Sequence, residues 1–488
     1  MKLQQVHLRI NDAATGQPTP VRLRITDADG VYYAPYGRLT EFATGMNQDV
    51  GGNVQIGGKN WAYIDGSCEI LLPPGPLHVE ITKGPEFKPI DEHITLLVGK
   101  MSLRLSIERW SDVRKQGWYS GDARVHFLSP DAALLEGQAE DVAVVNLLAT
   151  EFEEHGARAI PNVLSFSGQK FGRETEGSGV AVNTFNRCCG LGSLGLLHCH
   201  RIVFPLTLHD PALTRDWTLA DYCDQCHRKM GLVVWSNPRL LTSSFSYGEP
   251  LADLILGKID AFEIVPSDAA PHSALDVFYR LLDADLMVPL VGASGKCDNT
   301  RPLGEMRTYA HLPGDQKFNY TAWIEAVRLG RTFVSNGPFI HFTINGAVPI
   351  HTCSVSTATT QLQIRAEAKS TGRFDHLELL WNGDVVETAA PSATFPYRAE
   401  LELELPLREN GWLAARCVTN RTHGIEPLPM AHTSAVAIRL AESPHRAQAT
   451  ALRHLLDELD GMLRWFTRNP RLVHVLEEAR TVLAKKLS

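Results

Sequence analysis

The sequence predicts an α/β core flanked by two β-sandwich domains and followed by a helical hairpin. In residues 1–112, apolar and polar residues alternate over short runs separated by turn clusters, which is typical of antiparallel strands. In residues 113–338, apolar runs alternate with helical segments, and this order indicates an α/β sheet or barrel. Strand patterns return in residues 339–442, and residues 443–488 have the apolar spacing of helices.

The first segment shows its strands through strict alternation. Residues 21–25 read Val-Arg-Leu-Arg-Ile and residues 77–81 read Leu-His-Val-Glu-Ile, so each run places its apolar side chains on one face. The turn cluster at residues 73–76, Pro-Pro-Gly-Pro, separates two such runs. Sheets with one apolar face must cover it, and this requirement predicts a β-sandwich.

The core is predicted from apolar runs of strand length and from helical segments between them. We expect a helix over residues 130–140, because the Ser129 hydroxyl can accept from free amides of the first turn and Pro130 has no amide that needs a partner. A second helix is expected over residues 219–230. The predicted core strands lie at residues 142–148, 232–235, 261–265 and 288–291.

The last third of the chain combines a β-domain with a helical tail. Residues 361–366 and 397–405 alternate as strands do, and Asn382-Gly383 has the composition of a hairpin turn. Leucines and other apolar residues then recur at helical spacing on both sides of Asn469-Pro470, which separates two helices. We expect these helices either to form a homo-oligomer interface or to pack on the chain's own β-domain.

Composition limits the partners and the compartment. The chain has 488 residues, 44% of them hydrophobic, and a net charge of -8 without a basic stripe that could neutralise a phosphate backbone, so nucleic acid is not an expected partner. The first residues show no signal sequence, and no long apolar run indicates a membrane span. Nine cysteines without a framework pattern suit a reducing compartment, so a cytoplasmic protein is expected.

Four motifs in the core occur in the order found in one family of hydrolases. They are Gly-Trp-Tyr-Ser-Gly-Asp-Ala-Arg-Val-His at residues 117–126, Trp-Ser-Asn-Pro at 235–238, Gly-Lys-Ile-Asp-Ala-Phe-Glu at 257–263, and Gly-Arg-Thr-Phe-Val-Ser-Asn-Gly-Pro at 330–338. Together they resemble PHP-type metallohydrolases, in particular the carbaryl-hydrolase-like group. The resemblance implies a PHP-like distorted (β/α) barrel core and extends over both β-domains and the tail.

The resemblance also implies a degenerate metal site. Arg124 stands where the first histidine of the opening pair is expected and only His126 remains, while Asn237 replaces the histidine before Pro238 and Gly295 replaces a late aspartate. Arginine does not release its proton to bind a metal and glycine has no side-chain ligand. A multinuclear centre is therefore not expected, and at most one divalent ion, zinc or manganese, would bind with His126 as its retained ligand.

The resemblance also implies which residues would form the site. Arg124 and Lys296 would bring cations to the former metal position, and His126 would act as a general base oriented by Asp122 or Glu263. The alternative is that Arg124 and Lys296 only pair with Asp122 and Asp298 and fill an inactive site. The expected substrate-binding residues are Gln169, Ser193, Asn237, Asp298 and Arg307.

Three other patterns in the sequence have the composition of possible sites. Cys223, Cys226 and His227 have haem-attachment or zinc-like spacing, but they fall in a predicted helix and are interpreted as core cysteines. His198 and His200 would share one face of a strand and are interpreted as satisfied histidines. Residues 172–192 are rich in Gly, Ser, Thr and Asn and are predicted to form a long loop beside the pocket.

The functional prediction is a hydrolase-like enzyme that acts on a small ester, amide, carbamate or glycoside-like substrate with a reduced or absent metal site. One alternative is a non-catalytic protein that binds a sugar or an organic anion in a cationic pocket. Another is a metal-independent lyase or isomerase in which His126 and Lys296 transfer protons.

Overall fold

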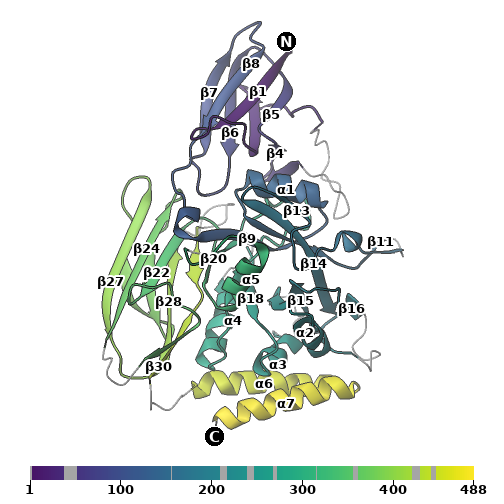
Figure 1. Ribbon diagram of the computed structural model, residues 1–488, viewed down its shortest axis with the longest axis vertical. Helices are drawn as coiled ribbons and strands as arrows, with labels where there is room; N and C mark the ends of the chain where they lie inside the picture. Colours follow the sequence, from purple (N-terminus) through teal and green to yellow (C-terminus); the bar gives the residue numbers. More distant parts are fainter. Residues whose placement is uncertain are drawn as a thin grey trace.

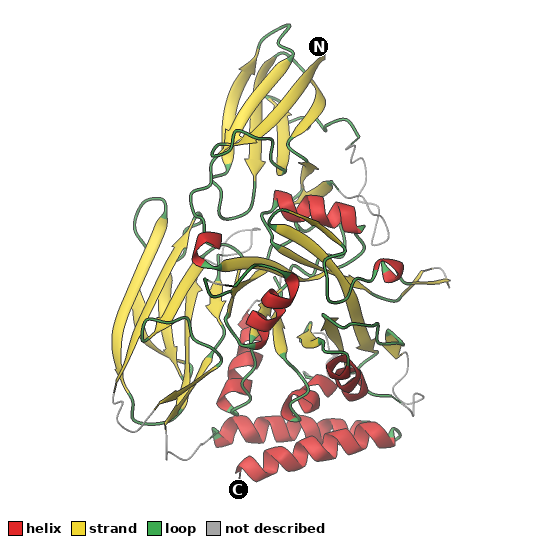
Figure 2. Cartoon of the chain, in the orientation of Figure 1, coloured by secondary structure: helices red, strands yellow, loops and turns green. Residues whose placement is uncertain are grey.

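The computed structural model describes residues 3–37, 52–154, 157–208, 217–238, 247–266, 272–314, 316–355, 361–419, 429–440 and 447–487. It is a mixed α/β structure with many strands, a curled central sheet and helices that pack around that sheet (Figures 1 and 2). The N-terminal strands project at one end of the molecule, and the two tail helices lie across the opposite end (Figure 1).

The N-terminal segment forms two sheets that share one apolar core. The first has the order β5 (Ser67–Leu72), β1 (Gln4–Asp12), β8 (Ser102–Ile107), and the second has the order β3 (Asn53–Ile56), β4 (Lys59–Ile64), β2 (Val21–Asp27), β6 (Gly75–Thr82), β7 (Ile90–Leu96). Val6 and Leu8 of the first sheet and Leu23 and Val79 of the second belong to the same buried cluster. The apolar residues of the alternating runs therefore point into this shared core, as the sequence predicted.

The core is a curled sheet built around β9 (Trp118–Val125). On one side, parallel pairs join β9 to β10 (Val144–Ala149) and β10 to β14 (Ser178–Cys188). Antiparallel pairs then lead through β15 (Gly192–Leu197) to β17 (Leu232–Ser236), and parallel pairs continue to β18 (Ala261–Ile264) and β19 (Leu290–Gly292). On the other side, β9 pairs with β20 (Arg307–His311). The Thr308 hydroxyl, which bonds to both backbone groups of Gly292, brings β20 next to β19.

Helices cover the outside of the curled sheet. They are α1 (Pro130–Ala139), α2 (Leu219–Arg228), α3 (Glu249–Ile255), α4 (His272–Asp283) and α5 (Tyr320–Arg328). The predicted start of α1 is confirmed, since Ser129 Oγ accepts from Ala132 N at 3.2 Å. Helices α1 and α2 end one or two residues earlier than predicted. Short strands lie at the edges of the core: β11 (Phe152–Glu154), β12 (Ala157–Ala159), β13 (Arg173–Thr175) and β16 (Thr207–Leu208).

Residues 172–192 are the main departure from the sequence-based prediction. The expected loop contains β13, the long strand β14 and the start of β15. The reason is that β14 lies between β10 and β15 and is buried along most of its length, so it lacks the polar face that alternation would reveal. Its glycine at position 179 allows the close approach of Phe171, because a Cβ there would lie 2.5 Å from the ring.

The central sheet continues into the C-terminal segment. Strand β21 (Thr332–Ser335) pairs with both β20 and β29 (Ala431–Thr433), and β29 pairs with β28 (Gly411–Val418). Strand β28 also pairs with β25 (His376–Trp381) and with β30 (Val436–Leu440). Beyond these, β25 pairs with β26 (Asp384–Ala389), and β30 pairs with β23 (Thr352–Val355). A separate sheet has the order β22 (Phe339–Ile344), β24 (Gln361–Ser370), β27 (Tyr397–Pro406). The two sheets share an apolar core, and the predicted hairpin turn at Asn382-Gly383 joins β25 to β26.

The tail is a pair of helices that packs on the core helices. Helix α6 (Ala449–Trp465) contacts α4, and α7 (Pro470–Leu487) contacts α3 (Figure 1). Leu455 and Leu476 share a buried cluster with Leu251 of α3 and Phe278 of α4. The apolar faces that the sequence predicted are thus covered by the chain's own core. Within the described residues, no helix is both long and apolar enough to cross a bilayer.

Candidate functional site

The candidate site lies where β9, β17 and β18 end, and its centre is a buried ion pair. Arg124 Nε donates to both oxygens of Glu263 at 3.1 and 3.0 Å, and Arg124 Nη2 donates to Glu263 Oε1 at 2.9 Å. The side chain of Glu263 is fully buried and that of Arg124 is 10% exposed. The backbone amide of Asn237 donates to the same Oε1 at 3.0 Å. Asn237 has a φ of +55°, a left-handed conformation that asparagine adopts more readily than most residues.

Asp122 is fully occupied by donors and serves to fix the loop that follows β19. Its Oδ1 accepts from the amides of Ser294 at 3.0 Å and Arg124 at 3.1 Å, and its Oδ2 accepts from Ser294 Oγ at 2.5 Å and from the amide of Gly304 at 2.8 Å. Burial raises the pKa of Asp122, although these four donors oppose the rise. The carboxyl therefore neither orients His126 nor pairs with the Arg124 guanidinium.

His126 is a neutral imidazole with one defined acceptor. Its Nδ1 lies 3.0 Å from the carbonyl oxygen of Leu148, and because a carbonyl only accepts, Nδ1 must carry the proton and Nε2 the lone pair. Burial and then the charge of Arg124 lower the pKa of His126 to about 3. The expected carboxylate partner is thus replaced by a backbone carbonyl, which orients the ring and raises its pKa by less than burial and Arg124 lower it.

Lys296 turns away from this cluster. Its Nζ donates to the carbonyl oxygens of Asp298 at 3.0 Å and Arg301 at 2.8 Å, and it lies 3.5 Å from Glu136 Oε2 of helix α1. Only its backbone belongs to the site, since the Lys296 carbonyl accepts from the amide of His126 at 2.8 Å. The residue lies just after a core strand, as the sequence predicted, but the direction of its side chain is set by a partner on another element.

The other residues predicted to bind substrate differ in their positions and contacts. Ser193 Oγ donates to the carbonyl of Ser236 at 3.0 Å, directly before Asn237. Asp298 Oδ1 accepts from the amide of Thr300 at 2.8 Å, so it caps a turn. Arg307 donates to the carbonyls of Gly304 and Glu140 and lies on the side of the core that faces α1. Gln169 is half-buried in the turn after Gly168.

Two site residues were missed because β14 was not predicted as a strand. The Phe185 ring lies 5.2 Å from the His126 ring and 5.7 Å from the Arg124 guanidinium carbon. Arg187, two residues later and thus on the same face of β14, is close enough for its charge to contribute to the low pKa of His126. Recognition of residues 178–188 as a strand would have placed both side chains beside the site.

The donor set does not fit a divalent metal ion. Asp122 has both oxygens engaged by amides and a hydroxyl, and Glu263 is engaged by a guanidinium and an amide, so neither of these two carboxylates is available to complete a coordination shell with His126 Nε2. Arg124 adds a positive charge at the position where a cation would have to bind. Throughout the described part of the chain, no group of three or more His, Cys, Asp or Glu residues is arranged to hold a metal.

The histidine and cysteine patterns resolve into separate contacts. His198 follows β15 with a φ of +58°, and its Nε2 lies 3.0 Å from Thr321 Oγ1, whereas His200 is exposed and its Nδ1 lies 3.0 Å from the carbonyl of Lys229. The two histidines therefore do not lie on one face of a strand, and this prediction was wrong. Cys223 and Cys226 are buried in α2, as predicted.

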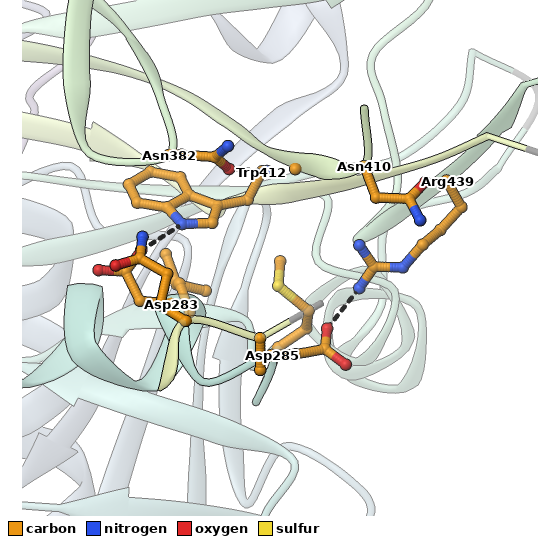
Figure 3. A pocket seen from close by; sticks show the side chains of 11 residues that line it. Asp283, Asp285, Asn382, Asn410, Trp412 and Arg439 are labelled. Carbon is orange, nitrogen blue, oxygen red and sulfur yellow. Dashed lines mark hydrogen bonds and ion pairs between the residues drawn. The ribbon is translucent and has the colours of Figure 1, made fainter. Parts of the chain in front are cut away.

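A small cavity lies elsewhere, where α4, the C-terminal strands and the start of α6 meet (Figure 3). Trp412 Nε1 donates to Asp283 Oδ1 at 3.0 Å and Arg439 Nη2 pairs with Asp285 Oδ1 at 2.6 Å across it. Its volume is about 60 Å³. We interpret it as a polar joint between segments.

Comparisons with known proteins leave the family open. No family model and no curated protein matches the chain. Among solved structures, one similar chain is an engineered protein from the Northeast Structural Genomics Consortium, with 11% sequence identity and a TM-score of 0.14. The match covers 38% of this chain and about half, 49%, of that chain.

Proposed function

We propose that the strand-end cluster binds a small organic anion without hydrolysing it. The observation that carries this proposal is the unused edge of Arg124. Glu263 occupies the edge formed by Nε and Nη2, and among the described residues Nη1 has no hydrogen-bond partner. A guanidinium has a second edge, formed by Nη1 and the other hydrogen of Nη2, that matches the two oxygens of a carboxylate or phosphate.

Gly295 lies beside this second edge and has no side chain that would cover it. A Cβ at position 295 would lie 3.0 Å from Arg124 Nη2 and 3.6 Å from Nη1, so any other residue would crowd the free donors. The φ of Gly295 is +63°, which also favours glycine. The absence of a side chain there supports a role for the edge in ligand contact.

The balance of charge around the cluster also favours an anion. Arg124 is neutralised by Glu263, but the charge of Arg187 also reaches His126. His126 stays neutral near pH 7 because its pKa is about 3, so its Nε2 can accept a hydrogen bond from a hydroxyl on the same ligand. A small hydroxy acid or sugar acid has both groups.

Titration calorimetry with small carboxylates and phosphate esters tests this proposal. Substitution of Arg124 alone would leave Glu263 buried and unpaired, so the informative variant is Arg124→Gln with Glu263→Gln, which removes both charges together. We expect this double variant to fold and to lose at least about tenfold in affinity, the effect of one charge-assisted contact. The control is Arg173→Gln, which removes an exposed cation paired with Asp131. Equal binding by the double variant would contradict the proposal.

The second candidate function is the hydrolase-like activity on an ester, amide, carbamate or glycoside-like substrate. The observation in its favour is the fixed lone pair of His126 Nε2, which could accept a proton from water. A low pKa makes this imidazole a weak base, which is why binding is preferred. Turnover of chromogenic esters that disappears in His126→Gln, with anion binding retained, would favour the hydrolase and overturn the non-catalytic part of the proposal.

We also propose that the core is a PHP-like distorted barrel flanked by β-sandwich domains, with boundaries near residues 112, 338 and 442. Support comes from Asp122, Asn237 and Glu263, which belong to three of the four motifs and lie at neighbouring strand ends. The carboxyl ends of barrel strands are where functional residues gather in such folds. An experimental structure whose core superimposes on PHP proteins would test this assignment.

A further inference from the structure

Cys199 and Cys226 are two thiols in direct contact. Their sulfur atoms lie 3.2 Å apart, with Cys199 in the turn that follows β15 and Cys226 near the end of α2. A disulfide bond is about 2.0 Å long, so the sulfurs need to approach by only about 1 Å. Both cysteines are free thiols in the structure.

The surroundings hold the two sulfurs together. Gly231, just beyond α2, has no room for a side chain, because a Cβ there would overlap both sulfur atoms. Cys199 is 2% exposed and Cys226 is fully buried. Burial keeps the pKa of the Cys226 thiol well above its usual range, so this sulfur is not a ready nucleophile in the closed structure. The pair is therefore protected until this turn opens or a small oxidant enters.

The neighbouring cysteine has a different environment. Cys223 lies one helical turn before Cys226 and is also buried, but burial and then the carboxyls of Asp253 and Glu249 raise its pKa. The two carboxyls with the largest effect on Cys223 belong to helix α3, whereas Cys226 contacts Cys199 in the turn after β15. Cys223 thus provides a natural comparison on the same helix.

We propose that Cys199 and Cys226 form a disulfide when the protein meets a peroxide. In the first step, the Cys199 sulfur attacks hydrogen peroxide, the O–O bond breaks, and a sulfenic acid and one water result. In the second step, the Cys226 sulfur attacks the sulfenic sulfur, the S–S bond forms, and hydroxide leaves and takes up the thiol proton as a second water. Two thiols lose two electrons in total, and one peroxide is reduced to two waters.

The bond would lie at the edge of the sheet opposite the candidate site, because Leu197 at the end of β15 pairs with Leu232 at the start of β17, whereas the site lies at the end of β17. It would link the end of β15 to the end of α2 and close a loop of 27 residues. A cross-link of this kind lowers the entropy of the unfolded chain and stabilises the folded state. The oxidised protein should therefore resist unfolding of α2 and return to the starting state when a thiol reductant is added.

Peptide mapping of the whole protein after treatment with hydrogen peroxide tests the proposal. Free thiols are first blocked in denaturant, and trypsin then places Cys199 in residues 188–201 and Cys226 in residues 216–228. We expect a linked species with a mass about 2 Da below the sum of the two peptides that carry the blocking group on Cys188, Cys189 and Cys223, because two hydrogens are lost. Its fragmentation should place the bond at Cys199 and Cys226, and the melting temperature should rise by about 2–4 °C and fall again with dithiothreitol.

Cysteine-to-serine variants show which sulfur atoms form the bond. The linked species should persist in Cys223→Ser and in Cys189→Ser, which removes an exposed thiol on the Cys199 peptide, and should disappear in Cys226→Ser. Should Cys226→Ser fail to fold, fragmentation of the wild-type species decides the same question. No linked species, or one whose fragments place the bond at Cys188, Cys189 or Cys223, would overturn the proposal.

Discussion

Lys296 and Glu136 form an ion pair at 3.5 Å between the loop after β19 and helix α1, with the lysine side chain 1% exposed and the glutamate fully buried. The lysine is therefore a structural cation that joins the curled sheet to the helix outside it. The same residue was expected in the binding site because it follows a core strand. A structural role predicts that substitution of Lys296 lowers stability, whereas a role in the binding site predicts that it weakens anion binding.

Lys296→Met should destabilise the protein and leave anion binding intact. The variant leaves Glu136 buried without its cation, and burial already raises the pKa of this carboxyl, so unfolding in urea should show a loss of roughly 3–5 kcal/mol. Lys296→Met combined with Glu136→Leu should recover most of the loss, because neither charge then remains. Unchanged stability together with weaker anion binding would place Lys296 in the site.

Gly295→Ala should weaken anion binding through contact with Arg124. The new methyl group would lie 3.0 Å from Nη2 of the guanidinium, and we expect a loss of about tenfold or more in affinity, the effect of one bidentate contact. Calorimetry measures this directly. Gly257→Ala is a matched control, because its φ of +72° gives similar backbone strain but nothing lies within 4 Å of the added Cβ. If both variants bind equally well, the free edge of Arg124 is not the contact.

The stability of the protein should fall in acid partly because of His126. Its pKa is about 3 in the folded protein and near 6.5 in an unfolded chain, so the unfolded chain gains a proton first as the pH falls. The contribution is complete above pH 6.5 and is lost progressively between pH 6.5 and 3, by at most about 1.4 kcal/mol per pH unit. Unfolding curves of wild type and His126→Gln across this range measure the difference. Parallel curves would mean that His126 is protonated more easily than its burial indicates.

Asp253→Leu should stabilise the protein. Asp253 in α3 is fully buried, and neither of its carboxylate oxygens has a hydrogen-bond partner among the residues that the structure describes. Burial and then the neighbouring Glu249 raise its pKa, so the folded state loses stability as the pH rises above the unfolded value near 3.9. We expect a gain of roughly 1–3 kcal/mol that is larger at pH 8 than at pH 5. The exposed Asp276 of α4 is the control, since Asp276→Leu should give no such gain.

Local signals predicted much of the fold. Ser129 caps α1, Asn382-Gly383 turns a hairpin, and the tail helices bury the faces that their periodicity indicated. Each of these features depends on residues that are close in the sequence. The order of strands and helices in the core was also visible, because buried strands and amphipathic helices differ in length and spacing.

Long-range partners explain what the sequence did not reveal. Strand β14 carries Asn183 and Asn186 in its interior, and these amides are satisfied by Tyr320 and Val203, which belong to other elements. A strand with buried polar residues has no apolar alternation to detect. In the site, the type and order of residues placed Arg124 and Glu263 correctly near each other. The sequence could not show that Glu263 takes one edge of the guanidinium and leaves the other open.

The ladder between β21 and β29 has a consequence for how this chain can be divided. Residues 333–335 pair with residues 431–433, so the central sheet does not end where the core motifs end. A fragment that stops at residue 338 would present β21 as an unprotected edge with free amides and carbonyls, a surface on which other chains readily add strands. Expression of the core alone should therefore favour aggregation, and fragments for crystallography should retain the chain through β30.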